Sequence, residues 1–177
     1  KIYPSILYGR ACLYLNDGQA ENAYELFEKI ANTPYNSKVL ILTRFWLGEL
    51  AYKLGRVSES IVYLERYLQD PQQTNEVSIV HAHYTLGYAY LKQNAYQKAM
   101  GHFNDALSGT AITQYEMYQK DAFTRIADCQ MMLKNLKLAL QNYQRIIDLN
   151  LEYKDYAALQ KSILWGGLGK PNEKINT

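Results

Sequence analysis

Four small residues recur along the chain at a nearly constant spacing, each just after a short polar turn. They lie 37, 39 and 40 residues apart and are Ala23, Ser60, Ala99 and Ala139. The turns before them are residues 16–18, 54–56, 93–95 and 134–135. A small residue lets two helices approach closely, whereas larger apolar residues fill the space between helices. The spacing therefore predicts consecutive helical hairpins, with each small residue near the start of a second helix.

The pattern between these turns is helical throughout. Only four prolines and ten glycines interrupt the sequence, and no segment keeps the alternation of a strand. We expect one array over residues 1–177, with hairpins at about 3–34, 36–70, 75–108 and 113–150 and a partial fifth at 151–177. Its first helix is expected at about Leu151–Leu164, followed by a turn at residues 166–169 and a new helix at Pro171.

Residues 84–107, YTLGYAYLKQNAYQKAMGHFNDAL, resemble a tetratricopeptide repeat, with the family's spacing of L-G, Y, Y, A, F and A-L. There are two departures: His83 fills the slot where the family usually has Trp, and no Pro follows Leu107. The resemblance covers essentially the whole chain. It implies an all-α fold, a right-handed superhelical solenoid of antiparallel helix hairpins, and a role as a protein-interaction scaffold.

The long connectors between the hairpins are similar to those of bacterial envelope-associated members of this family. They comprise residues 69–78 and 108–116. This narrower resemblance implies a periplasmic or cell-envelope location, with the cytoplasm as the alternative.

The composition excludes several classes of partner. Hydrophobic residues make up 48% of the 177 residues and charged residues 20%, as in chains that fold. The net charge of +2 gives no basis for binding nucleic acid, which usually requires a strongly basic face. No apolar run approaches the roughly 18 residues of a membrane-spanning helix, so we expect no direct membrane insertion.

Motifs for catalysis, cofactors and metals are also missing from the sequence. The segment GGLGKP at 166–171 lacks the first glycine of a phosphate loop, because Leu164 stands at that distance. His81 and His83 point roughly 200° apart on a helix and cannot share one metal ion. His102 has no partner set by the sequence. We therefore expect no enzymatic activity, no cofactor and no metal.

The helix expected at 80–92 carries two apolar stripes whose centres lie roughly 130° apart. One contains His83, Leu86, Gly87 and Tyr90, and the other contains His81, Tyr84, Tyr88 and Leu91. A single buried face explains one stripe but not both. The second stripe is expected to face the concave surface of the array or the first helix of the next hairpin.

Shifting this second stripe by the repeat spacing predicts a partner-binding groove. Its residues are Tyr8, Phe45, Trp46, Glu49, Tyr52, His81, Tyr84, Tyr88, Lys92, Arg125 and Asp128. Tyrosine combines apolar area with a hydroxyl group at modest entropic cost, as is common in recognition surfaces. Alternatively, some of these rings fill gaps between neighbouring first helices.

The leading hypothesis is a non-enzymatic scaffold that binds a peptide or partner helix in this aromatic groove. One alternative is a small-ligand module for carbohydrate, with the Trp46 ring as a stacking platform. Another is a spacer that self-associates through the unfinished C-terminal repeat. Candidate residues for that contact are Leu159, Ile163, Leu164 and Trp165.

The register itself can be tested by overpacking. Replacing Ala99 by Arg, or Gly87 by Leu, should insert a large side chain where two helices meet and lower the free energy of unfolding by roughly 1–3 kcal/mol or more. Thermal unfolding measures this loss. Wild-type stability in both variants would mean that the predicted register is wrong.

Overall fold

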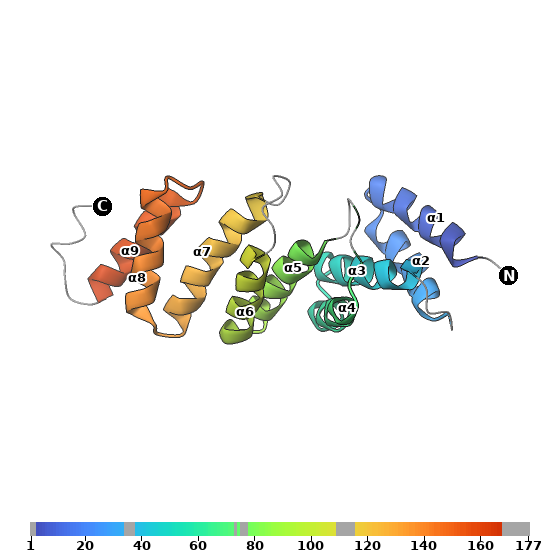
Figure 1. Ribbon diagram of the computed structural model, residues 1–177, viewed down its shortest axis with the longest axis horizontal. Helices are drawn as coiled ribbons and strands as arrows, with labels where there is room; N and C mark the ends of the chain where they lie inside the picture. The colour runs from blue at the N-terminus through green and yellow to red at the C-terminus, as the bar shows by residue number, and fades with distance from the viewer. Residues whose placement is uncertain (1–2, 34–37, 73, 75–77, 109–115, 168–177) are drawn as a thin grey trace. The chain divides into compact units, whose positions relative to one another are not determined.

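The computed structural model describes residues 3–33, 38–72, 74, 78–108 and 116–167. This described part contains nine α-helices and no strand, which confirms the all-α class (Figure 1). The helices are α1 (Pro4–Asn16), α2 (Ala20–Ala31), α3 (Lys38–Lys53), α4 (Val57–Gln69), α5 (Ile79–Lys92), α6 (Tyr96–Ser108), α7 (Glu116–Met132), α8 (Leu136–Asp148) and α9 (Lys154–Gly167). The expected turn at Leu168-Gly169 and the new helix at Pro171 lie outside the described residues.

The four predicted turns all separate helices at the expected places. One residue of each turn has a left-handed backbone conformation: φ is +73° at Gly18 and +79° at Gly55, and it is +57° at Asn94 and +63° at Lys134. Glycine adopts this conformation without steric cost, and asparagine tolerates it better than most residues. The same turn geometry therefore recurs at the same register, even where the sequence supplies a lysine.

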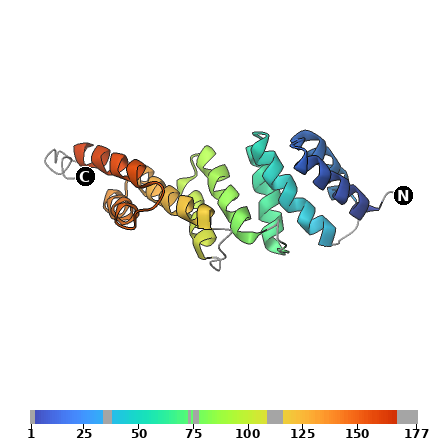
Figure 2. The same cartoon turned by 90° about the horizontal axis from the view of Figure 1, so that it is seen from above.

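The chain divides into two compact units, and the first comprises Lys1–Gln93. Within it, α1 packs against α2 and α3 against α4, and α5 lies against α3 and α4 (Figures 1 and 2). The backbone N–H of His81 donates to the hydroxyl of Ser78 at 2.9 Å, so Ser78 caps the start of α5. The core around the first three helices consists of Ala11, Ala23, Tyr24, Phe27, Ile30, Leu47, Leu50 and Ala51.

The second unit comprises Asn94–Thr177, in which α7 packs against α6 and α8, and α8 against α9. Helix α9 begins at Lys154, three residues later than expected. Leu159 and Ile163 are exposed on α9, in line with their predicted place on an open face. Leu164 was expected there too, and this is wrong: it is buried in a core with Ala127, Ala139, Tyr143, Ile146 and Ala157.

First and second helices of the first unit differ in how much of their circumference is buried. The buried residues of α4 are Ser60, Ile61, Leu64 and Tyr67, which lie on one face. Helix α3 instead has eight buried residues distributed around its axis, because it packs against neighbours on several sides. Only a limited sector of α3 is left for other contacts.

All four small residues that define the repeat are fully buried. A close helix approach also lies at another small residue, Gly48 of α3. A Cβ atom added to Gly48 would lie 2.4 Å from Cγ of Leu64 and 3.3 Å from its backbone nitrogen. A larger residue at position 48 therefore requires the Leu64 side chain or the two helices to shift.

Replacing Gly48 by Ala should destabilise the protein by about 1–3 kcal/mol, because the new methyl group overlaps Leu64. Gly9 provides the control, since a Cβ atom there meets nothing within 4 Å. Gly9→Ala should stabilise α1 by about 0.5–1 kcal/mol through helix propensity. Urea unfolding compares the two variants, and equal effects at both positions would contradict the close approach.

Candidate functional site

The predicted groove residues of the first unit lie on its three first helices, α1, α3 and α5. On α3, each step of three residues turns the side chain back by about 60°, so Trp46, Glu49 and Tyr52 share one arc of about 120°. On α5, His81, Tyr84, Tyr88 and Lys92 share an arc of about 80° by the same rule. Lys92 is exposed, and the others are partly exposed, as is Tyr8 on α1. We call these eight residues the aromatic face: Tyr8, Trp46, Glu49, Tyr52, His81, Tyr84, Tyr88 and Lys92.

A hydrogen bond joins α1 to α3 within this face. Nε1 of Trp46 donates to the hydroxyl oxygen of Tyr8 at 3.0 Å. The indole ring also stacks on Phe27 of α2, with centroids 6.4 Å apart and planes inclined by 11°. Tyr8 meets the same Phe27 ring edge to face at 5.5 Å. Phe27 is fully buried, so it holds both rings in place from below.

Phe45 belongs to the packing beneath the aromatic face. Its side chain is fully buried. Its ring makes edge-to-face contacts with Trp46 at 5.2 Å, Tyr67 at 5.4 Å and His81 at 5.7 Å. Phe45 therefore positions Trp46 and His81, and it has no surface of its own to offer a partner in this structure.

Glu49 and His81 form a polar pair between α3 and α5. Nε2 of His81 lies 3.3 Å from Oε2 of Glu49, with side chains 27% and 15% exposed respectively. Burial raises the pKa of Glu49 to about 8, and burial lowers the pKa of His81 to about 4. With both groups shifted toward their neutral forms, the carboxyl is protonated, the imidazole is uncharged, and the pair carries no net charge near pH 7. A neutral pair costs little to desolvate when another molecule covers it.

Two aromatic contacts complete the face around α5. The ammonium group of Lys92 lies 4.5 Å from the centre of the Tyr52 ring, a cation–π contact that joins α5 to α3. The rings of Tyr84 and Tyr88 meet edge to face at 5.1 Å. The aromatic face thus offers ring surface, hydroxyl groups, a neutral polar pair and one ammonium group, a combination suited to noncovalent recognition.

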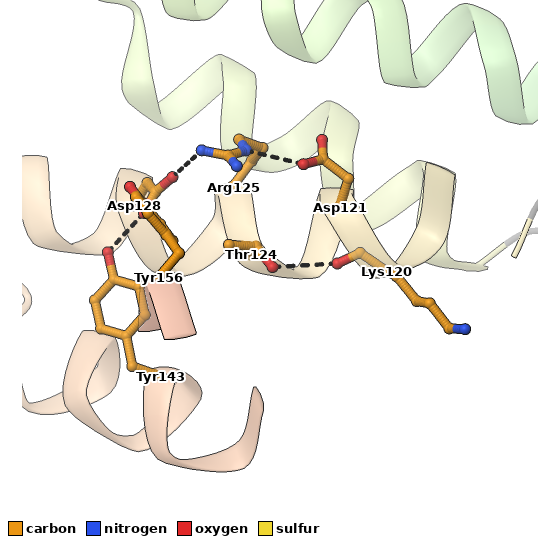
Figure 3. Close-up of polar contacts among 7 residues, drawn as sticks. All are labelled: Lys120, Asp121, Thr124, Arg125, Asp128, Tyr143 and Tyr156. Atoms are coloured by element: carbon orange, nitrogen blue, oxygen red, sulfur yellow. Dashed lines mark hydrogen bonds and ion pairs between the residues drawn. The ribbon is translucent and has the colours of Figure 1, made fainter. Parts of the chain in front are cut away.

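The other two predicted residues, Arg125 and Asp128, lie on α7 in the second unit. Figure 3 shows Arg125 between two carboxylates. Its Nε donates to Asp121 at 3.2 Å and its Nη1 to Asp128 at 2.6 Å. The guanidinium also lies 5.4 Å from the ring of Tyr156 on α9. Arg125 thereby links two turns of α7 to α9.

Asp128 connects three helices of the second unit. One of its oxygens accepts hydrogen bonds from Tyr143 of α8 at 2.7 Å and from Tyr156 at 3.0 Å (Figure 3). Burial raises the pKa of Asp128, even though these bonds and Arg125 favour the carboxylate. The charges of Arg125 and Asp128 are therefore compensated inside the second unit, where they tie α7, α8 and α9 together.

Sequence reasoning missed the residues that hold the site residues in place. Phe27 and Tyr143 fit the repeat spacing as core residues, but the spacing does not predict that they contact Trp46 and Asp128. Tyr156 lies on a helix with a weak repeat pattern. The only available signal was the periodic placement of Phe27 and Tyr143 on second helices, facing a neighbouring first helix.

Comparisons with known proteins agree with the helical-hairpin architecture. One tetratricopeptide repeat model matches residues 4–32 and 80–108, and a second model of the same description matches residues 121–150. No match is found among curated proteins. None of the helices in the described ranges is long and apolar enough to cross a membrane.

Several solved structures share this fold at low sequence identity. A crystal structure of MamA is 17% identical, with a TM-score of 0.76 over 98% of this chain and 86% of that one. MamA from Desulfovibrio magneticus RS-1, from residue 41 to its end, is 13% identical, with a TM-score of 0.74 over 98% and 89%. The apo form of RapI is 12% identical, with a TM-score of 0.73 over 98% and 67%.

The Glu49–His81 pair predicts a specific pH dependence of stability. The folded state keeps Glu49 protonated up to about pH 8, whereas the ordinary value is 4.5, so ionisation opposes folding. Between pH 7 and 8, where His81 (ordinary pKa 6.5) is mostly neutral in the unfolded state as well, the free energy of unfolding should fall by up to about 1 kcal/mol per pH unit. Glu49→Gln should remove this fall.

Urea unfolding at several pH values between 7 and 8 measures the difference between wild type and variant. Glu25→Gln, at an exposed position on α2, is the control and should leave the slope unchanged. Parallel pH profiles for wild type and Glu49→Gln would contradict the raised pKa.

Proposed function

Because the chain is a tetratricopeptide repeat protein, we propose that it is a scaffold whose aromatic face binds an extended peptide or a helix of a protein partner. Proteins of this repeat family bind protein partners and are typically non-catalytic. The aromatic face has the composition for such binding, since buried Tyr and Trp side chains contribute much of the energy of protein interfaces.

The proposal rests on one observation, the continuity of the aromatic face over three helices. Trp46 donates a hydrogen bond to Tyr8 of α1, Glu49 is paired with His81 of α5, and the ammonium group of Lys92 lies over the Tyr52 ring. These contacts fix the side chains before a partner arrives. A rigid surface loses less conformational entropy on binding than one whose side chains must first be ordered.

The chemistry of the face defines the kind of ligand that suits it. Ring surface from Tyr84, Tyr88 and Trp46 favours apolar side chains. Lys92 provides a cation at the C-terminal end of α5, which favours an acidic group at one end of the ligand. Arg125 and Asp128 were predicted in the same groove, but they are engaged within the second unit and are not included in this proposal.

The alternatives have weaker support. A carbohydrate platform at Trp46 would have only the ring face that does not stack on Phe27, and the indole N–H already donates to Tyr8. Self-association is favoured by one observation, the exposure of Leu159 and Ile163 on α9 at 57% and 53%. The bacterial cell-envelope location stays a prediction from the connector resemblance.

Peptides selected from a phage-displayed random library on the immobilised protein provide a probe for the aromatic face. Tyr84→Ala and Tyr88→Ala should each weaken the binding of a selected peptide by about tenfold or more, as expected for buried interface tyrosines. Tyr63→Ala is the matched control, since Tyr63 is a partly exposed tyrosine on the second helix α4. Fluorescence anisotropy measures the affinities.

Failure to select any peptide, or equal affinities in all variants, would contradict the proposal. A glycan array probed with the same protein tests the carbohydrate alternative, for which a signal lost in Trp46→Ala would be decisive. Light scattering at increasing protein concentration tests self-association, and a monomer at every concentration would exclude that alternative.

A further inference from the structure

In the first unit, the second helix α2 contacts the next second helix, α4, around Tyr24. The hydroxyl of Tyr24 on α2 donates to Glu59 of α4 at 2.6 Å. The guanidinium of Arg56, which immediately precedes α4, lies 4.6 Å from the centre of the same ring. Helix α4 also packs closely on α3 at Gly48. Helices α2 and α3 thus form a surface on which the amphipathic helix α4 packs.

Helices α8 and α9 repeat this arrangement in the second unit. Ala23 of α2 and Ala139 of α8 are the equivalent, fully buried small residues, which aligns Tyr24 with Leu140. Helix α9 follows and packs against α8, as α3 follows and packs against α2. In place of a covering helix there is an open groove of about 570 Å³ between α8 and α9.

The groove has an apolar floor and a cationic rim. Leu136 and Leu140 of α8 and Trp165 of α9 provide the apolar surface, and Lys137 and Lys161 stand beside it. Lys161 donates a short hydrogen bond to Gln144, which connects the two sides of the rim. No helix covers this groove within the described residues, which extend to Gly167.

The charge on α8 beside this groove is opposite to the charge on α2 in the first unit. In the register set by Ala23 and Ala139, three exposed or half-exposed positions of α2 and α8 can be compared. They carry Glu21, Glu25 and Glu28 on α2, and Lys137, Gln141 and Gln144 on α8. At α2, Arg56 places its guanidinium over the Tyr24 ring, and Glu59 of α4 accepts a hydrogen bond from the Tyr24 hydroxyl. A groove flanked by Lys137 and Lys161 favours a negatively charged ligand.

We propose that the groove between α8 and α9 binds an amphipathic helix of a partner protein, one whose apolar stripe is flanked by carboxylates. The apolar stripe would cover Leu136, Leu140 and Trp165. The carboxylates would pair with Lys137 and Lys161. This site uses a different unit and different helices from the aromatic face, so either site can fail without the other.

A probe for this site can be made from the chain's own covering helix. The acidic probe is a fluorescein-labelled peptide of residues 56–70 that carries Arg56→Glu and Arg66→Glu, and the unaltered peptide is its control. The full chain should bind the acidic probe at least tenfold more tightly than the unaltered peptide. Fluorescence anisotropy at low ionic strength measures both affinities, and added salt should reduce the difference.

Variants of the protein locate the binding. Leu140→Arg and Trp165→Ala should each weaken the acidic probe by at least tenfold. Leu138→Arg is the matched control, because Leu138 is an exposed leucine of α8 that does not line the groove, and it should bind as the wild type does. Lys161→Glu should reverse the preference between the two peptides. Thermal unfolding of each variant separates lost binding from lost folding.

Three outcomes would overturn the proposal. The first is no binding of the acidic probe, or binding that Leu140→Arg, Trp165→Ala and Lys161→Glu leave unchanged in folded protein. The second is a dimer in light scattering that Leu140→Arg dissociates, which would assign the groove to a second copy. The third is tighter probe binding by a variant ending at Gly167, which would assign the groove to residues 168–177.

Discussion

The close approach of paired helices is the constraint on which the structure of the first unit depends. At Gly48 the backbone of α3 lies so near Leu64 that a single methyl group would overlap it. Buried small residues at Ala23 and Ser60 mark the same close packing on α2 and α4. Once the second helix lies this close on one side, the first helix is buried around most of its circumference, and its remaining sector has a defined position.

The aromatic face occupies that sector and is ordered by the packing beneath it. Phe45 and Trp46 are adjacent in sequence but about 100° apart around α3, so one is buried and the other is partly exposed. Burial also neutralises Glu49 and His81, so the polar centre of the face carries no net charge near neutral pH. In the second unit, Arg125 and Asp128 occupy the corresponding predicted positions, but hydrogen bonds to Asp121, Tyr143 and Tyr156 use them to join helices.

Local features of the sequence were sufficient to predict the helices and their turns. The turn residues and the small residue after each turn place α2, α4, α6 and α8 correctly, because both signals depend on neighbours in the chain. The burial of Phe45 and Leu164 was not predictable: Phe45 was expected in the groove and Leu164 on the open C-terminal end, but both are buried by helices distant in sequence. The same holds for the Trp46–Tyr8 hydrogen bond, which spans 38 residues. Periodicity indicates which face of a helix is apolar, but only the packed neighbours determine whether that face is covered.

The claim that the first helices bind a partner while the second helices build the support can be measured by hydroxyl-radical footprinting with a selected peptide. Mass spectrometry reports the oxidation of each aromatic side chain with and without the peptide. We expect protection at Tyr8, Trp46, Tyr84 and Tyr88, with Tyr63 on α4 unchanged. Protection of Tyr63 without protection of Trp46, Tyr84 or Tyr88 would contradict the account.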